Sequence, residues 1–297
     1  MNRRTAIAAA FSLLPLSNPL LVGSATALAT GVLVLSTQAS HAQRADDYID
    51  AGIEKYKRGD YQGAITDYSK AIEINPQLAE AYSNRGVSNR ELGDYQRAIA
   101  DYDKAIEIDP QISSVYYNRG ITKRKSEDYQ GAVADFSQAI EIDPQNAHAY
   151  NNRGNAKKIL KDNQGAMADF NKAIEINSQL AEAYSNRGNA KRDLGDYQGA
   201  ITDFNKAIKI EPRQAVIYYN RGLLKLSSGD NQGAIADYNK AIEIDPQISD
   251  AYLYRAHAKY RLKDYQGMCL DFNKASSMRN QDAINLLHKL KSAGACQ

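Results

Sequence analysis

Residues 184–212 read YSNRGNAKRDLGDYQGAITDFNKAIKIEP, and this stretch decides the fold. It contains the triplet Asn186-Arg187-Gly188, and the same triplet occurs around Arg85, Arg119, Arg153 and Arg221. Each copy lies 34 residues after the one before it. A fixed period of this length indicates that one small helical or strand unit is repeated along the chain.

Extended in both directions, the period gives seven units that cover residues 45–282 without an insertion, starting at residues 45, 79, 113, 147, 181, 215 and 249. Each unit predicts two helices. In the fifth unit Gly195 ends the first helix, Asp196 caps the second, and Pro212 prevents fusion with the next unit. The capping aspartate recurs in every unit, as Asp60, Asp94, Asp128, Asp162, Asp196, Asp230 and Asp264. The sequence therefore predicts an all-α stack of helical hairpins.

Small residues and aromatic residues recur at fixed positions of the units. In the fifth unit Gly188 and Ala200 allow the two helices to approach closely, and Tyr184 and Phe204 pack around them. Ala207 follows Phe204 by three residues, which places both on one face of the second helix.

This pattern resembles the tetratricopeptide repeat family. The match consists of the period of 34, aromatics at the fourth and twenty-fourth positions, Gly at the eighth, Ala at the twentieth and twenty-seventh, and Pro at the thirty-second. The resemblance implies a right-handed α-solenoid of seven repeats, whose first helices line a concave groove that binds peptide or protein segments. Residues 283–297 are expected to form a capping helix and tail. One departure is the arginine at the seventh position, where the family often has leucine.

We interpret this arginine as structural. Arg85, Arg119, Arg153, Arg187, Arg221 and Arg255 are each followed sixteen residues later by Asp101, Asp135, Asp169, Asp203, Asp237 and Asp271. A desolvated guanidinium needs a partner, and a carboxylate on the facing helix supplies one. In the first unit Ala51 replaces the arginine, so Asp67 is expected to lack its partner.

The asparagine of the triplet is a candidate ligand contact, because it points about 100° away from the arginine. By resemblance, the second, fifth, sixth, ninth, twelfth and thirteenth positions of the first helix can face the groove. The predicted peptide-binding residues are the amides Asn84, Asn118, Asn152, Asn186, Asn220, Asn155 and Asn189 and the cations Arg90, Arg124, Lys158 and Arg192. The cations would favour acidic segments. The alternative is that all of these side chains form a solvated helix face.

The family's clamp for a terminal carboxylate is absent, since the fifth positions lack lysine and the second positions lack lysine and arginine. His148, His257 and His288 lie in different parts of the chain, and no nucleophile elbow, phosphate loop or zinc motif stands out. We therefore expect no enzyme activity, no cofactor and no metal site.

Residues 1–42 have the features of a secretory signal peptide. They begin with Arg3 and Arg4, contain two apolar runs and no acidic residue, and end in small residues before Gln43. An uncleaved anchor is the alternative, although the second run is short for a bilayer span. We expect export to a periplasm or the medium, or to a thylakoid lumen if the source has one. Without the leader the chain carries equal numbers of basic and acidic residues, so nucleic acid is not an expected partner.

Cys269 and Cys296 leave two alternatives open. They can form a disulfide bond in an oxidising compartment, or Cys269 can be a small buried residue and Cys296 a free thiol in the tail.

Taken together, the sequence predicts an exported, non-enzymatic scaffold that binds protein or peptide segments, with no small-molecule substrate, in the assembly of an envelope or membrane-associated complex. The alternative is a structural protein that associates with itself.

Overall fold

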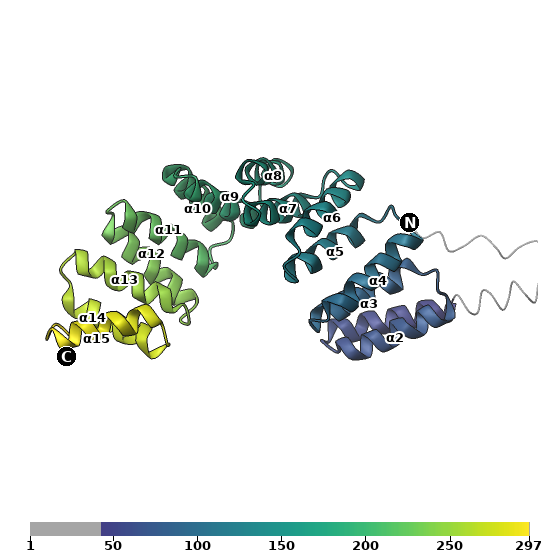
Figure 1. Cartoon of the computed structure of the whole chain (residues 1–297), viewed down its shortest axis with the longest axis horizontal. Coiled ribbons are helices and arrows are strands. Elements are labelled where there is room, and N and C mark those ends of the chain that lie inside the picture. The colour runs from purple at the N-terminus through teal and green to yellow at the C-terminus, as the bar shows by residue number, and fades with distance from the viewer. Residues whose placement is uncertain (1–42, 297) are drawn as a thin grey trace, which may run out of the picture. The chain divides into compact units, whose positions relative to one another are not determined.

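The computed structural model describes residues 43–296, which contain helices and no strand (Figure 1). The first helices of the repeats are residues 43–57, α3 (Ala79–Glu91), α5 (Ser113–Lys125), α7 (Ala147–Ile159), α9 (Ala181–Asp193), α11 (Ala215–Ser227) and α13 (Ser249–Arg261). The second helices are α2 (Tyr61–Ile74), α4 (Tyr95–Ile108), α6 (Tyr129–Ile142), α8 (Asn163–Ile176), α10 (Tyr197–Ile210), α12 (Asn231–Ile244) and α14 (Tyr265–Ser277). A last helix, α15 (Gln281–Ser292), follows them. The all-α architecture of stacked repeats is as predicted.

The chain divides into two compact units, with the boundary between Arg85 and Gly86 inside α3. The N-terminal unit contains the first helix pair and the start of α3. The C-terminal unit contains α4 and all later helices, and its pairs follow one another in chain order.

Each second helix begins where the sequence predicts it. The side chain of Asp196 accepts a hydrogen bond from the backbone N–H of Gly199 at 2.9 Å, and this satisfies one of the free N–H groups at the start of α10. The other six aspartates cap their helices in the same way.

Close approach of the two helices depends on a glycine of the first helix in six of the seven repeats, and the seventh has Ala256 at this position. A Cβ atom added to Gly154 would lie 2.7 Å from the ring of Phe170, which is completely buried. Ala166 and Ala173 on α8 are also completely buried. The glycine therefore leaves the space that the aromatic ring fills, as the sequence pattern predicts.

The first helices of neighbouring repeats contact one another as well as their own partners. Such contacts join α5 to α7, α7 to α9, α9 to α11 and α11 to α13. We call the surface that these five helices share the first-helix face.

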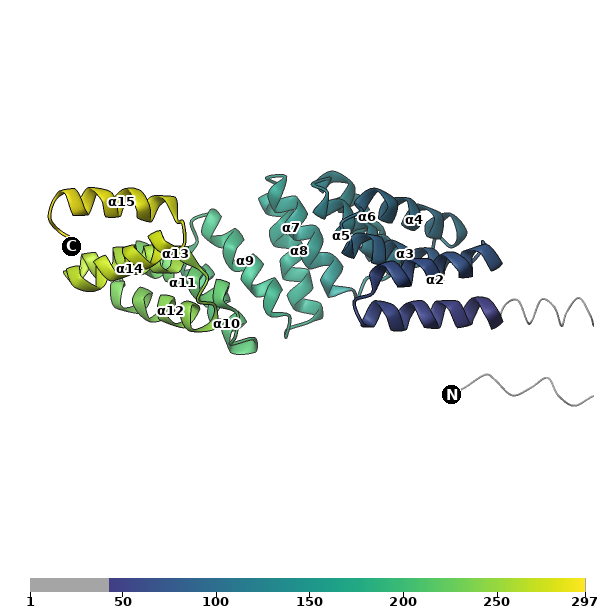
Figure 2. The same ribbon diagram turned by 90° about the horizontal axis from the view of Figure 1, so that it is seen from below.

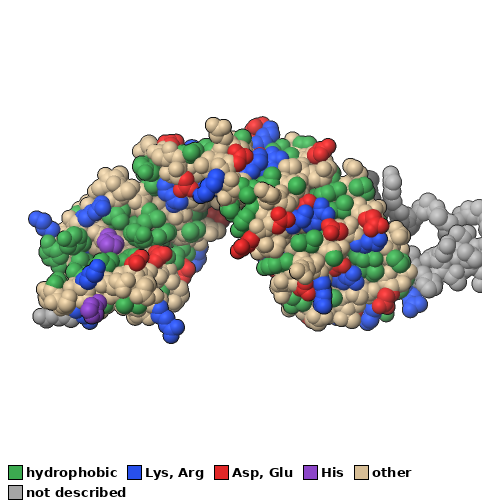
Figure 3. Space-filling view, viewed as in Figure 1, with side chains coloured by type: hydrophobic (Ala, Val, Ile, Leu, Met, Phe, Trp, Pro, Cys, Tyr) green, Lys and Arg blue, Asp and Glu red, His purple; other side chains and the backbone are tan. Residues whose placement is uncertain are grey.

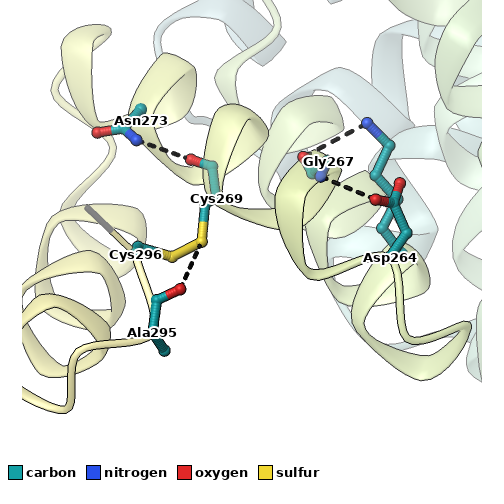
Figure 4. The surroundings of a disulfide bond; sticks show 7 residues. Asp264, Gly267, Cys269, Asn273, Ala295 and Cys296 are labelled. Atoms are coloured by element: carbon teal, nitrogen blue, oxygen red, sulfur yellow. Dashed lines mark hydrogen bonds between the residues drawn. A yellow bond between two sulfur atoms is a disulfide. The ribbon is translucent and has the colours of Figure 1, made fainter.

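The C-terminal end is closed by α15, which lies beside α14 (Figure 2). Ala283 and Leu287 pack into a cluster with Tyr252, Met268 and Phe272. Cys269 and Cys296 form a disulfide bond that ties the tail to α14 (Figure 4). Cys296 is buried in the same cluster, so the alternative of a free thiol in the tail is wrong.

The predicted signal peptide, residues 1–42, lies outside the described residues. Within residues 43–296, every helix is too short or too polar to span a membrane.

Candidate protein-binding face

The arginine of the triplet forms a paired network in the C-terminal unit. Nε and Nη2 of Arg187 donate to the two carboxylate oxygens of Asp203 at 2.8 and 2.6 Å. The same bidentate pair joins Arg119 to Asp135, Arg153 to Asp169, Arg221 to Asp237 and Arg255 to Asp271. The hydrogen bond to Asp203 raises the pKa of Arg187, as expected for a cation held by a carboxylate. Arg85 and Asp101 belong to different units, so the sixth pair stays a prediction.

Each aspartate of these five pairs also has a second cation, which was not predicted. Lys191, one turn after Arg187, lies 2.9 Å from Asp203. Lys123, Lys157, Lys225 and Lys259 take the same place in their repeats, 2.8 to 3.0 Å from their aspartates. The signal was present in the sequence, because residues four apart share one helix face.

The expectation that Asp67 lacks a partner is wrong, because the first repeat also has a lysine four residues after the arginine position. Lys55 lies 2.6 Å from the Asp67 carboxylate in the N-terminal unit, where Ala51 replaces the arginine. A lysine on the first helix therefore provides a positive charge for the buried aspartate in that repeat.

The arginine also links neighbouring repeats. Nη1 of Arg187 donates to Oδ1 of Asn171 on α8, the second helix of the preceding repeat, at 2.8 Å. Its guanidinium lies over the ring of Tyr184, 5.5 Å from the centroid. The equivalent acceptors elsewhere are Ser69, Asp103, Ser137, Asn205 and Asn239. Each of the three guanidinium nitrogens of Arg187 donates a hydrogen bond within the protein. The role of Arg187 is therefore to hold α8, α9 and α10 together.

The predicted asparagines lie along the first-helix face, apart from Asn84 in the N-terminal unit, and some of them connect its helices. Nδ2 of Asn186 donates to Oδ1 of Asn151 at 2.9 Å, and Nδ2 of Asn152 donates to the Tyr117 hydroxyl at 3.1 Å. Asn118 accepts a weak bond from Arg90 at 3.3 Å. The side chains of Asn155 and Asn220 have no hydrogen-bond partner within the described part of the chain. Ligand contact and solvation were the two predicted roles, and bonds between repeats are a third.

A pocket of about 260 Å³ between α9 and α11 brings three of the predicted residues together. Asn186, Asn189 and Asn220 all line it, together with Ser185, Gln214, Glu182, Glu211, Ala181, Val216 and Ile217. Oδ1 of Asn189 is buried without a donor, so no hydrogen bond at that atom fixes this amide. The volume is below the range of roughly 300–1,000 Å³ that is usual for small-molecule sites. The pocket is therefore suited to one side chain of a longer ligand.

The predicted basic run is largely paired within the protein. Lys158 lies 2.9 Å from Asp193, Arg192 lies 3.1 Å from the same carboxylate, and Arg90 lies 2.9 Å from Glu91. Nε of Arg124 is buried without a hydrogen-bond partner. The run therefore carries less free positive charge than its residue types indicate.

The face becomes aromatic toward its C-terminal end. Tyr219 on α11 packs against Tyr254 on α13, and Tyr254 packs against His257, with ring centroids 6.0 Å apart in both pairs. Figure 3 shows hydrophobic side chains gathered beside a histidine in this part of the surface. Burial and the nearby charge of Arg261 lower the pKa of His257, and burial raises the pKa of Tyr219 to about 12.

Comparison with known proteins gives both sequence and structural matches. A family model described as TPR repeat matches residues 52–89, 122–160, 154–191 and 188–227, and one described as tetratricopeptide repeat matches residues 79–112 and 215–248. A search of curated proteins returned no relative.

Three solved structures illustrate the similarity. A tetratricopeptide repeat protein from Parabacteroides merdae is 25% identical, with a TM-score of 0.64 over 84% of this chain and 98% of its own. YrrB, described as a TPR protein with an unusual peptide-binding site, is 27% identical, with a TM-score of 0.52 over 65% of this chain and 97% of its own. MamA is 26% identical, with a TM-score of 0.51 over 54% of this chain and 94% of its own.

The family matches together span more than half of the sequence, and the match at residues 215–248 covers the helix pair α11 and α12. This chain belongs to the tetratricopeptide repeat family.

Proposed function

We propose that this protein is a non-enzymatic scaffold that binds an extended protein segment along the first-helix face of its C-terminal unit. The observation that carries the proposal is the pocket between α9 and α11, where Asn186, Asn189 and Asn220 meet with hydrogen-bonding groups unused by the protein. Side-chain amides can both donate to and accept from a peptide backbone. The similarity to YrrB, whose structure is described as having a peptide-binding site, adds support.

Site-specific crosslinking tests this proposal. A photoreactive phenylalanine analogue at Asn220 should crosslink a discrete partner in the native compartment, and the same analogue at Thr202, exposed on second helix α10, should not. Purified partner should then bind the wild type and bind an Asn189→Ala/Asn220→Ala variant more weakly. Identical adducts from both positions would reject the face as the binding surface.

We further propose that the scaffold acts outside the cytoplasm, in an envelope or membrane-associated complex. Support comes from the Cys269–Cys296 disulfide, because such bonds persist in oxidising compartments. N-terminal sequencing of the protein from fractionated cells should give Gln43 as the first residue. An intact leader on protein retained in the cytoplasm would contradict this part of the proposal.

Self-association is the second candidate function. It is favoured by large apolar side chains that are exposed near the C-terminal end, at Tyr260, Leu262, Tyr265 and Leu270. Sedimentation analysis separates the two functions: a monomer over a wide concentration range favours the scaffold, and mass that rises with concentration in the absence of a partner favours self-association.

A further inference from the structure

We infer that the pocket between α9 and α11 binds a lysine or arginine side chain of the bound segment. This inference rests on the proposed function and adds the chemistry of the partner. Of the ten lining residues, Glu182 and Glu211 are acidic and none is basic. Within residues 43–296 neither carboxylate forms an ion pair, so both charges are available to a ligand.

Glu211 departs from the pattern of its repeat position. In the other connections between repeats the equivalent residue is Asn75, Asp109, Asp143, Asn177 or Asp245, and each accepts a bond from the backbone N–H two residues later, at 2.9 to 3.1 Å. The longer Glu211 side chain instead accepts from Nε2 of Gln214 at 2.8 Å. It stands at the C-terminal end of α10 as its equivalents do in their helices, but its side chain accepts no bond from the backbone of the connection. Helix capping therefore does not explain this carboxylate.

Gln214 also departs from the pattern of its repeat position. Its position holds an apolar side chain in most connections, as with Leu180, which is only 8% exposed. The other exception, Asn146, is accounted for because it caps α7. Gln214 is exposed and caps nothing through its side chain. The pocket thus lies at the connection where two positions lack the structural role that they have in the other repeats.

The remaining groups in the pocket suit a cation with several N–H donors. Asn186 uses its Nδ2 on Asn151, which leaves its Oδ1 as an acceptor. Asn220 adds a second amide oxygen. Lysine and arginine donate from several N–H groups and accept none, so they match a set of carboxylate and amide oxygens.

Nearby cations of the protein do not neutralise this site. Arg187 and Lys191 are paired with Asp203, and Arg192 is paired with Asp193. Arg213 is exposed in the same connection but does not line the pocket. A bound basic side chain would therefore be the main partner of the two glutamates.

A library of random dodecapeptides displayed on phage tests the inference with the purified protein. Peptides enriched on the wild type should share a lysine or arginine at one position. A Glu182→Gln/Glu211→Gln variant should lose that preference and bind the enriched peptide, made synthetically with an acetylated N-terminus, about tenfold more weakly, which corresponds to ~1.4 kcal/mol. Norleucine in place of the shared lysine, or a neutral side chain in place of a shared arginine, should weaken binding to the wild type to the same level.

The matched control is Glu141→Gln/Glu243→Gln, which changes the net charge equally but alters exposed carboxylates on α6 and α12. This control should bind like the wild type, and circular dichroism should show all variants equally helical. Enriched peptides without a basic residue, bound equally by wild type and pocket variant, would overturn the inference and leave the proposed function standing. If no peptide is enriched over an unrelated protein, the proposed function fails and the inference fails with it.

Discussion

Removing Arg187 should destabilise its repeat less than removing its partner Asp203. Asp203 is nearly completely buried, with a side chain that is 3% exposed, and it holds both Arg187 and Lys191. Breaking a buried ion pair by deleting one partner costs about 3–5 kcal/mol when the other charge is left alone. In Arg187→Leu the aspartate keeps Lys191 at 2.9 Å, so we expect a loss of about 2 kcal/mol.

In Asp203→Ala both cations lose their carboxylate, and we expect the loss to reach about 3–4 kcal/mol. The N-terminal unit supports this ranking. There Lys55 forms an ion pair with the buried Asp67, and the arginine is absent. That repeat therefore forms without the arginine, although it retains the aspartate.

Urea denaturation followed by circular dichroism measures the total effect. With a slope near 3 kcal/mol per molar, the expected losses correspond to midpoint shifts of roughly 0.7 and 1.2 M. Because stacked repeats can open locally, hydrogen exchange should be read for α9 and α10 in parallel. Arg213→Leu is the control, since Arg213 is exposed, and its stability should stay within about 0.5 kcal/mol of the wild type.

The structural role of the arginine would be refuted by one combination of results. Arg187→Leu would have to match the wild type in midpoint and in hydrogen exchange of α8 to α10, and at the same time lose peptide binding. That outcome would make the guanidinium a ligand contact instead of a link between helices.

Three further predictions follow from packing, the disulfide and charge. Gly154→Val should cost about 3 kcal/mol of unfolding free energy, because the new side chain overlaps the buried ring of Phe170; a urea midpoint equal to that of the wild type would contradict this packing. Cys269→Ser should release the tail and remove about 3–4 kcal/mol of local stability, seen as faster hydrogen exchange in α15 and unchanged exchange in α9. Burial opposes ionisation of Asp193, but Lys158 and Arg192 outweigh it and lower its pKa, so the stabilisation exists above pH 3.8 and disappears as the pH falls below the folded-state pKa. The difference in unfolding free energy between wild type and Asp193→Asn should therefore be present at pH 7 and decrease as the pH falls below 3.8; a constant difference would show that it does not arise from this charge.

The repeated features of the fold could be predicted because the residues that determine each feature recur at the same position in several repeats. The capping role of Asp196 and the close packing at Gly188 need only local geometry and one neighbouring helix. The Arg187–Asp203 pair could also be found, since a charge at a packed seam requires a partner. Periodicity makes such inferences reliable because one physical requirement explains every copy.

The missed features depend on where helices of different repeats meet. The acceptor Asn171 for Arg187 and the Asn186–Asn151 bond connect residues of adjacent repeats. Their pairing follows from the angle at which one repeat stacks on the next, and a period alone does not specify that angle. Lys191 is different, because its spacing of four residues from Arg187 is enough by itself to place it beside Asp203.

Ligand recognition is the hardest property to read from near-identical repeats, since a side chain that recurs in every repeat is already accounted for by stacking. Arg187 and Gly188 are explained in this way, and half of the Asn186 amide is used on the neighbouring helix. Stacking does not explain the two exceptions, Glu211 and Gln214. Neither side chain makes the structural contact that is usual at its repeat position, and both line the pocket. In a repeat protein, a departure that costs a structural interaction and opens a cavity is therefore the stronger indication of a binding site than the repeated residues themselves.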